Sequence, residues 1–271
     1  MTTLAELGEF GLLAELERRG LVCGVEHDAA VVEGLVVTQD TLVEGVHFRF
    51  DLLGRRELGA RAAAVNISDL AASGAEPLAL LVSLGLPETT EAEDVLELYA
   101  GLNERGVPVR GGDTTRADRV VLAVTALGRS ERVPGRTGAT QGDAVVVTGP
   151  LGAAGAAFRA GRLPPVPDRV EEGKRLARVA TAMLDLSDGL APDAAHVAGR
   201  SGVRVAVELE RVPLADGAEL DDLGFGEDYE LLATTPDPLG FPVIGRVEEG
   251  EGVELTLRGE PYSLAGWEHF R

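Results

Sequence analysis

The stretch VVTQDTLVEGVHF, residues 36–48, begins as a buried strand and then changes character. Its first residues are apolar, whereas Asp40, Glu44 and His47 follow within eight residues. The chain already carries a formal net charge of -20, so further carboxylates beside an apolar run add charge repulsion. We therefore expect a functional reason for Asp40 at the end of this strand.

Strands and helices alternate on both sides of this stretch. In the first half, the patterns predict helices over 3–19, 55–73 and 90–105, a hairpin over 29–38, strands over 78–86, 107–110 and 119–127, and a turn at GGDTTR, 111–116. After a turn-rich segment at 128–143, they predict strands over 143–149, 203–209, 229–234, 241–247 and 252–258, with helices over 151–161, 169–181 and after DLSDGL. The expected fold class is α+β (mixed α/β). We expect an N-terminal α/β domain over 1–137, a C-terminal α+β domain over 138–271, and a cleft between them.

Composition excludes several classes of protein. No apolar run approaches the roughly 20 residues that a membrane span needs, and the first 20 residues lack the pattern of a signal peptide, so a cytoplasmic protein is expected. With 45 acidic and 25 basic residues, the chain as a whole repels nucleic acid and anionic membranes. Its single cysteine, Cys23, is expected to be a small buried apolar residue.

Five motifs place an aspartate at an apparent strand end or helix start, beside Gly, Ser or Thr. They are EHDAAVV (Asp28), TQDTLVEG (Asp40), NISDLAASG (Asp69), GGDTTR (Asp113) and DLSDGL (Asp185 and Asp188). Each alone is explained as a turn former or a helix N-cap. Together they also match what Mg²⁺ binds, because Mg²⁺ prefers oxygen ligands. Unpaired carboxylates that converge would repel one another, so a cluster of these aspartates requires cations among them. The sequence alone does not decide whether they converge.

Other motifs carry weaker signals. Arg116 and Arg136 suit a bidentate grip on phosphate, although a loop arginine is usually only solvated. VTGPLGAAG, residues 147–155, leads from a strand into a helix whose first N–H groups could take an anion, but its spacing is not that of a dinucleotide fingerprint. The P-loop, G-x-S-x-G and H-E-x-x-H motifs do not occur. Near the end, the single tryptophan, Trp267, either packs the tail onto the core or offers an aromatic face to a cationic ligand.

The motifs EHDAAVV, TQDTLVEGVHF, AVNISDLAASGAEP, GGDTTR, VTGPLGAAG, DLSDGL and GEDYELL, in this order and followed by GWEHF, resemble the thiamine-monophosphate kinase family of the aminoimidazole ribonucleotide synthetase superfamily. The resemblance implies a kinase that uses ATP and several Mg²⁺ ions to convert thiamine monophosphate to thiamine diphosphate. It also implies a homodimer whose N-terminal sheets pair, with the nucleotide in the cleft.

By motif, the resemblance implies three sets of site residues. The metal ligands are Asp28, Thr38, Gln39, Asp40, Asp69, Asp113, Asp185 and Asp188. The ATP contacts are Gly112, Asp113, Arg136 and Ser187. The contacts to thiamine monophosphate are His47, Glu227 and Trp267.

Four positions depart from the family pattern. His27 replaces the first aspartate of the usual GDDAA, and Gln39 replaces a hydroxyl residue, offering an amide oxygen instead. Arg105 stands where an aromatic residue is common, which puts adenine stacking there in doubt, and Phe225 replaces the first glycine of GGED.

The implied reaction explains why no base–nucleophile pair is found. The acceptor phosphate has a second pKa of about 6, so it is largely ionised and needs no general base. The obstacle is repulsion, at roughly 4 kcal/mol for each pair of unit charges 4 Å apart in an effective dielectric of 20. Two alternatives stay open: another ATP-dependent enzyme of the superfamily, or a non-catalytic nucleotide- or metal-binding module. Selenophosphate synthetases are expected to have an N-terminal cysteine or selenocysteine, and none occurs before Cys23. Hydrogenase-maturation relatives are expected to have a C-terminal cysteine, whereas this sequence ends in HFR.

Overall fold

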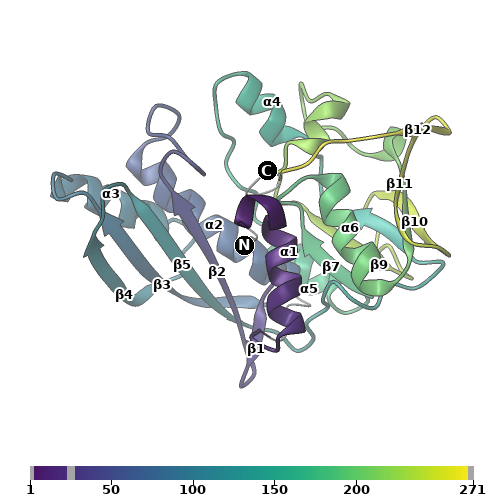
Figure 1. Ribbon diagram of the computed structural model, residues 1–271, viewed down its shortest axis with the longest axis horizontal. Coiled ribbons are helices and arrows are strands. Elements are labelled where there is room, and N and C mark those ends of the chain that lie inside the picture. The colour runs from purple at the N-terminus through teal and green to yellow at the C-terminus, as the bar shows by residue number, and fades with distance from the viewer. Residues whose placement is uncertain (1–2, 23–27, 268–271) are drawn as a thin grey trace.

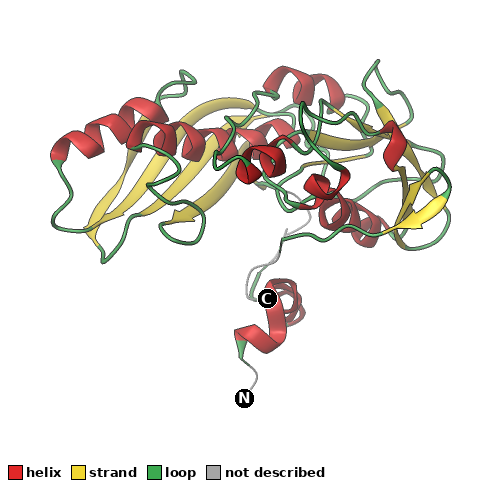
Figure 2. Ribbon diagram, turned by 90° about the horizontal axis from the view of Figure 1, so that it is seen from above, coloured by secondary structure: helices red, strands yellow, loops and turns green. Residues whose placement is uncertain are grey.

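Two β-sheets stand side by side in a computed structural model of the chain, which describes residues 3–22 and 28–267 (Figure 1). The first sheet has the strand order β1-β2-β5-β3-β4. Its strands are β1 (Ala30–Val32), β2 (Leu35–Val43), β3 (Glu76–Leu86), β4 (Val109–Arg116) and β5 (Val121–Arg129). Two helices, α2 (Arg55–Ala72) and α3 (Ala92–Leu102), cover one face of this sheet, as Figure 2 shows from above.

The second sheet collects strands from the rest of the chain in the order β12-β11-β8-β10-β6-β9-β7. These strands are β6 (Ala144–Val147), β7 (Ala182–Asp185), β8 (Arg204–Glu208), β9 (Leu231–Thr235), β10 (Val243–Glu248), β11 (Gly252–Leu257) and β12 (Glu260–Tyr262). The helices of this half are α4 (Ala153–Arg159), α5 (Val170–Leu176) and α6 (Leu190–Ser201), with short 3-10 turns η1 (Leu209–Arg211) and η2 (Leu220–Gly224). The expected α+β class with two sheet-based halves is confirmed, whereas the domain boundary at 137/138 stays a prediction.

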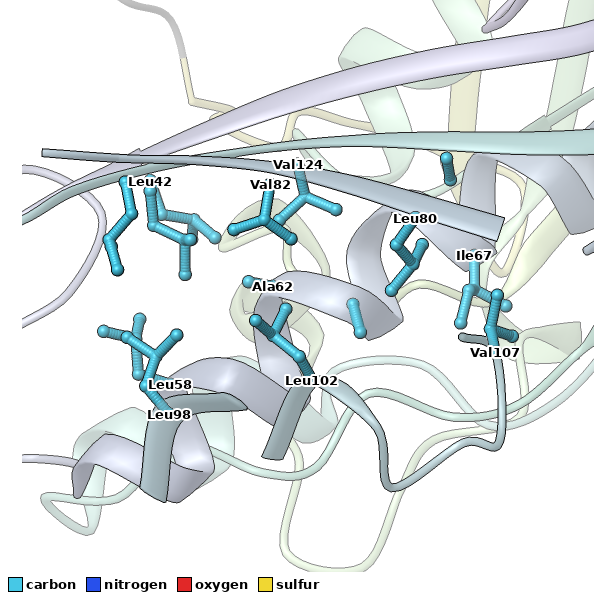
Figure 3. Close-up of a cluster of buried hydrophobic side chains, with 14 of the residues drawn as sticks. Leu42, Leu58, Ala62, Ile67, Leu80, Val82, Leu98, Leu102, Val107 and Val124 are labelled. Carbon is cyan, nitrogen blue, oxygen red and sulfur yellow. The ribbon is translucent and has the colours of Figure 1, made fainter. Parts of the chain in front are cut away.

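The core of the first half lies between the sheet and its two helices. Figure 3 shows Leu58, Leu98 and Leu102 of α2 and α3 pointing toward Leu80 and Val82 of the sheet. The helices cross at glycines: a Cβ atom on Gly59 would lie 1.9 Å from the carbonyl oxygen of Leu98. This backbone contact explains the glycine at this position of α2, since a larger side chain at the crossing would force the helices apart.

Helix α2 also packs against the second half of the chain. Its last turn contributes Ala71 and Ala72 to a buried cluster with Leu176 of α5 and with Met183 and Leu231 of the second sheet. The helix therefore runs from one half of the molecule to the other (Figure 1). Residues on different turns of α2 can reach strands of both sheets, and this places α2 at the centre of any shared site.

Strand register divides the residues of β2 between two faces. Thr38 and Asp40 pair through β5 with Leu80 and Val82, whose side chains are fully buried beneath α2. Gln39 pairs through Thr125 with Leu81, which is 40% exposed. Because successive side chains of a strand point to opposite faces, Gln39 lies on the face that α2 and α3 do not cover. We call this the open face of the first sheet.

Most sequence expectations for the elements are confirmed, but strands β7 and β12 were not predicted and one segment was assigned wrongly. Helix α1 (Leu4–Arg18), the hairpin of β1 and β2, and helix α2 occur where the patterns predicted them. GGDTTR is not a turn, however, but forms most of β4, a strand that pairs only with β3 in the described structure. An edge strand tolerates glycines and hydroxyl residues because only one side of it is paired, which explains the error.

Some expectations cannot be compared with the structure. Cys23, His27 and the terminal residues 268–271 lie outside the described part of the chain. Within the described ranges, no helix is both long enough and apolar enough to cross a membrane.

Candidate active site

Four aspartates from separate segments share one buried region where α2 passes between the sheets. Asp28 precedes β1, Asp40 is in β2, Asp69 is in α2 and Asp185 is the last residue of β7. Two hydroxyl groups are hydrogen-bonded to them: Thr38 donates to Asp69, and Ser68 Oγ donates to Asp185 Oδ2 at 2.5 Å. The convergence that the sequence left open therefore occurs for these four residues.

The strand position of Asp40 corrects one expectation. Strand β2 continues to Val43, so Asp40 lies inside the strand and not at its end. The described pairing of β1 with β2 runs from Leu35 to Val37, and the amide of Asp40 donates to Asn66 Oδ1 at 3.1 Å. Asn66 is fully buried and donates from Nδ2 to the carbonyl of Ala62 at 3.0 Å. Its amide thus fixes Asp40 against α2, because a buried backbone N–H needs a partner.

The electrostatics of the cluster are those of crowded carboxylates. Burial, together with the nearby charges of Asp40, Asp185 and Asp28, raises the pKa of Asp69 well above its ordinary value. Burial and the charge of Asp28 raise the pKa of Asp185 to about 7, although the hydrogen bond from Ser68 opposes this. Burial also raises the pKa of Asp40. Four carboxylates held together in this way repel one another unless a positive charge lies among them.

Positive charge within the described cluster comes from Arg136. Its Nε donates to Asp28 Oδ1 at 2.8 Å, and the two side chains form an ion pair. One guanidinium against four carboxylates leaves an excess of negative charge, and the donor set consists of carboxylate and hydroxyl oxygens. This chemistry fits a hard divalent cation such as Mg²⁺.

The DLSDGL segment continues the site beyond β7. The carboxylate of Asp193, which is 3% exposed, accepts the amide of Asp188 at 3.0 Å and that of Gly189 at 3.1 Å. Asp188, Asp193 and His196 each place a potential ligand atom within 4.8 Å of the others. Burial, helped by the charges of Arg136 and Arg200, lowers the pKa of His196 to about 4, so this imidazole is neutral at pH 7.

The GEDYELL turn brings a further carboxylate to the site. Glu227 forms an ion pair with Arg61 of α2, and the hydroxyl of Tyr229 donates to Glu227 Oε1 at 3.4 Å. The amide of Glu227 donates to the carbonyl of Ser187 at 2.8 Å, which joins this turn to DLSDGL. Glu227 and Tyr229 have φ angles of 61° and 52°, a left-handed conformation that costs energy for side chains other than glycine.

Known proteins are similar to this chain over nearly its whole length. The AIR synthase related protein N-terminal domain matches residues 26–130. Thiamine-monophosphate kinase of Aquifex aeolicus is 35% identical over 98% of this chain and 99% of its own length. The chain belongs to the thiamine-monophosphate kinase family.

Solved structures extend this likeness to the fold of the family. The structure of AaThiL complexed with AMPPCP and TMP is 34% identical, with a TM-score of 0.90 over 99% of both chains. The E. coli hydrogenase maturation protein HypE has a TM-score of 0.70 at 22% identity, covering 93% of this chain and 88% of its own. At that identity the likeness concerns the fold alone.

Not all residues that the kinase-family motifs single out lie in the cluster. Asp113 and Gly112 are exposed on β4, and Asp113 pairs with Ser83 on the open face. Gln39 lies on the same face and accepts a hydrogen bond from Thr125 Oγ1 at 2.9 Å. His47 lies in the turn after β2, where its Nδ1 accepts the amide of Val43 at 3.0 Å.

Trp267 and Arg105 lie outside the carboxylate cluster. Trp267 is 53% exposed, so it is not a buried anchor for the tail, and its amide donates to the carbonyl of Asp188 at 3.0 Å. Arg105 donates to the carbonyl of Val166 and pairs with Asp168 at 3.5 Å. Its guanidinium therefore holds the Pro-rich loop, residues 163–167.

The glycine-rich turn before α4 is not an open anion site in this kinase fold. The carboxylate of Asp228 accepts the amides of Gly152 at 2.7 Å and Ala154 at 3.2 Å. Burial raises the pKa of Asp228 to about 6, and these amide hydrogen bonds oppose the rise. The N–H groups that the sequence offered to a ligand are occupied by the chain itself.

Sequence reasoning missed several residues that shape the site: Arg61, Asn66, Ser68, Asp193 and Tyr229. Asn66 and Ser68 precede Asp69 in the quoted motif NISD, so that motif contained a signal for both. For Arg61 and Asp193 no signal distinguished them from other charged helix residues.

Proposed function

We propose that this chain transfers the γ-phosphoryl group of ATP to thiamine monophosphate, giving thiamine diphosphate and ADP. The observation that carries the proposal is the convergence of Asp28, Asp40, Asp69 and Asp185 in one buried region. Relatives support the proposal: thiamine-monophosphate kinases match nearly the whole chain, and one similar solved structure is complexed with AMPPCP and TMP.

Several Mg²⁺ ions are the cations that we assign to the carboxylates. When bound, Mg²⁺ neutralises phosphate oxygens and offsets the repulsion between two anionic reactants. Asp28, Asp40, Asp69 and Asp185 hold the ions, with Thr38 as a hydroxyl ligand and Asp188 at the margin. Thr38 and Ser68 each occupy one carboxylate oxygen as donors, so they orient the carboxylates and leave other lone pairs for the metal.

The remaining residues bind and orient the two substrates. Arg136, at the edge of the cluster with 29% of its side chain exposed, provides guanidinium donors to ATP phosphates, and Ser187 contacts the nucleotide nearby. Glu227 and Trp267 receive the thiamine end, and His47 contacts its phosphate. The acceptor phosphate is already ionised, so no general base is assigned.

We also propose that the protein acts as a homodimer through the open face of the first sheet. This face presents Val37, Leu81, Ala123 and Leu127 to solvent, while the opposite face is buried beneath α2 and α3. A sheet face with exposed apolar side chains is a common site of association. A second copy that covers this face would also enclose Gln39 and Asp113, giving these two proposed ligands a site that one chain does not provide.

The direct test is an assay of the purified chain with ATP, MgCl₂ and thiamine monophosphate, in which thiamine diphosphate and ADP are quantified together. Unphosphorylated thiamine is the matched control substrate, because it lacks the acceptor phosphate. Equal amounts of ADP and thiamine diphosphate are expected, with neither formed when EDTA replaces Mg²⁺. ATP binding without either product would favour a non-catalytic module. ADP release only with selenide or an aminoimidazole precursor would favour another enzyme of the superfamily.

A further inference from the structure

Arg61 is a buried cation in the middle of an alanine-rich helix. The residue is 7% exposed, and its neighbours on the helix, Ala62, Ala63 and Ala64, are also buried. A buried arginine has a large desolvation cost unless its donors are paired, so its presence in such a helix requires specific partners. Hydrophobic packing alone does not account for it.

The guanidinium of Arg61 joins three segments of the chain. Its Nη2 donates to Glu227 in the GEDYELL turn, and Nη1 donates to the carbonyl of Pro164 in the Pro-rich loop at 3.0 Å. Its centre lies 5.8 Å from the ring centroid of Tyr229. Among the residues that the structure describes, the buried Nε has no hydrogen-bond partner.

These contacts hold the Glu227 carboxylate from both oxygens. Arg61 binds Oε2, and the hydroxyl of Tyr229 lies 3.4 Å from Oε1. The backbone of Glu227 is fixed as well, through its amide and the carbonyl of Ser187. The side chain of Glu227 is nevertheless 31% exposed, whereas that of Arg61 is 6% exposed. A carboxylate has about four lone-pair sites, so Glu227 is held firmly and can still accept hydrogen bonds from a ligand.

Glu227 also lies within electrostatic reach of the acidic cluster. Its charge is among the causes that raise the pKa of Asp40, after burial and the charge of Asp28. The carboxylate therefore faces the same region as the proposed metal ligands, from the second half of the chain. A substrate with a phosphate at one end and a cationic heteroaromatic group at the other could span from the cluster to Glu227.

We propose that Arg61 is a positioning residue that keeps the Glu227 carboxylate aimed at the heteroaromatic end of the phosphate-bearing substrate. This inference rests on the proposed function, in which Glu227 binds thiamine monophosphate. Arg61 acts on the substrate through Glu227, with Tyr229 as the second support. The competing explanation is that Arg61 only fastens α2 to the Pro-rich loop, in which case its loss weakens the fold without selecting between the two substrates.

The test compares Arg61→Lys, Glu227→Gln and the double variant with the wild type. Lysine keeps the charge but cannot present the planar fork that reaches both Glu227 and Pro164. Arg56→Lys is the matched control, since Arg56 lies on the same helix and pairs with Glu104 at 2.6 Å, with 56% of its side chain exposed. For each protein, kcat and the KM values for thiamine monophosphate and ATP are measured, together with thiamine monophosphate binding by titration calorimetry and the melting temperature.

For Arg61→Lys we expect roughly a tenfold rise in the KM and Kd for thiamine monophosphate, with the KM for ATP and the kcat changed by less than about threefold, because only ground-state binding of one substrate is lost. The double variant should bind thiamine monophosphate no more than about twofold worse than Glu227→Gln, because the two residues act as one unit. Arg56→Lys should match the wild type.

Three results would overturn the inference. Unchanged binding of thiamine monophosphate by Arg61→Lys would show that Glu227 does not depend on Arg61. Losses that multiply in the double variant, or that fall equally on ATP and thiamine monophosphate, would show a general structural role. A wild-type protein that neither binds nor phosphorylates thiamine monophosphate would overturn the proposed function as well, whereas the first two results leave that function intact.

Discussion

The two faces of the first sheet differ in whether the same chain covers them: α2 and α3 cover one face, and the described part of the chain leaves the open face uncovered. Thr38 and Asp40 lie beneath α2, where Asn66 and Asp69 meet them and where burial raises carboxylate pKa values. Gln39 lies between them in sequence, but its side chain is on the open face, on the same side of the sheet as Leu81. Neighbouring residues of one motif therefore belong to different environments, and strand alternation decides which of them one chain can bring into a site.

The comparison yields predictions that differ in size, because charges on the covered face are buried and those on the open face are not. The largest effect is expected for Asp69→Ala, which removes a carboxylate from the centre of the cluster. We expect kcat to fall by roughly three orders of magnitude, the scale for loss of a preorganised electrostatic group. Product formation measures this, and Asp118→Ala, at an exposed acid, is the control. Near-normal turnover in Asp69→Ala would remove the covered face from the mechanism.

The second largest effect is expected for Leu81→Asp, which tests whether a second copy of the chain covers the open face. Leu81→Asp places a charge on that face, and a buried unpaired charge costs several kcal/mol at an interface. We expect sedimentation to show a dimer for the wild type and a monomer for the variant, with activity reduced accordingly. Leu96→Asp is the matched control, because Leu96 is 62% exposed on α3, away from the sheet. A wild-type monomer with full activity would refute the proposed role of the open face.

A moderate effect is expected from pH in the metal-free protein. The pKa of Asp185 is about 7 in the folded state, and its ordinary value is 3.8. Between pH 3.8 and pH 7, the carboxyl group is therefore protonated in the folded state and ionised in the unfolded state. Unfolding free energy should therefore increase as pH falls from 7.5 to 5.5, by at most about 1.4 kcal/mol per pH unit for this group.

Denaturant titrations in EDTA measure this dependence. Added Mg²⁺ should flatten it by favouring the ionised carboxylate, and Asp185→Asn should remove the contribution of this residue. Stability in EDTA that rises with pH over the same interval would contradict the burial of this carboxylate.

The smallest effect is expected for Gln39→Thr on the open face. Its amide oxygen accepts a hydrogen bond from Thr125 at 2.9 Å, in an exposed setting where one such bond contributes about 1 kcal/mol or less. Activity should stay within about threefold of the wild type, since threonine restores an oxygen ligand at the same position. A loss greater than about tenfold would mean that Gln39 has a role that a hydroxyl residue cannot fill.

The sequence predicted the elements that position the site better than it predicted the contacts within it. An Ala-rich stretch followed by a turn located α2, and two short apolar runs in a hairpin pattern located the first part of β2. The motifs around Asp40 and Asp69 were found because polar residues interrupt apolar runs. The assignment of GGDTTR to a turn failed because glycine and threonine suit both turns and edge strands, and only pairing with β3 decides between them. Position within a sheet is a long-range property.

Two contacts could not be inferred from any local pattern. The proposed anion site before α4 is occupied by Asp228, which lies 76 residues after Gly152 in the chain. Arg61 and Glu227 meet across an even larger separation, 166 residues. The first contact follows from the pairing of β6 with β9 inside the second sheet, whereas the second depends on the packing of α2 against the second half of the chain.

Helix α2 carries Arg61 near one end of the site and Asp69 near the other. Eight residues separate them, which at 1.5 Å per residue is a rise of about 12 Å along a rigid axis. In the proposed site, one continuous helix sets the distance between the group that holds Glu227 and the carboxylates that we assign to the metal ions. A single inserted residue between them would rotate one end by about 100° relative to the other, so under this proposal the length of ligand that fits depends on the residue count of one helix.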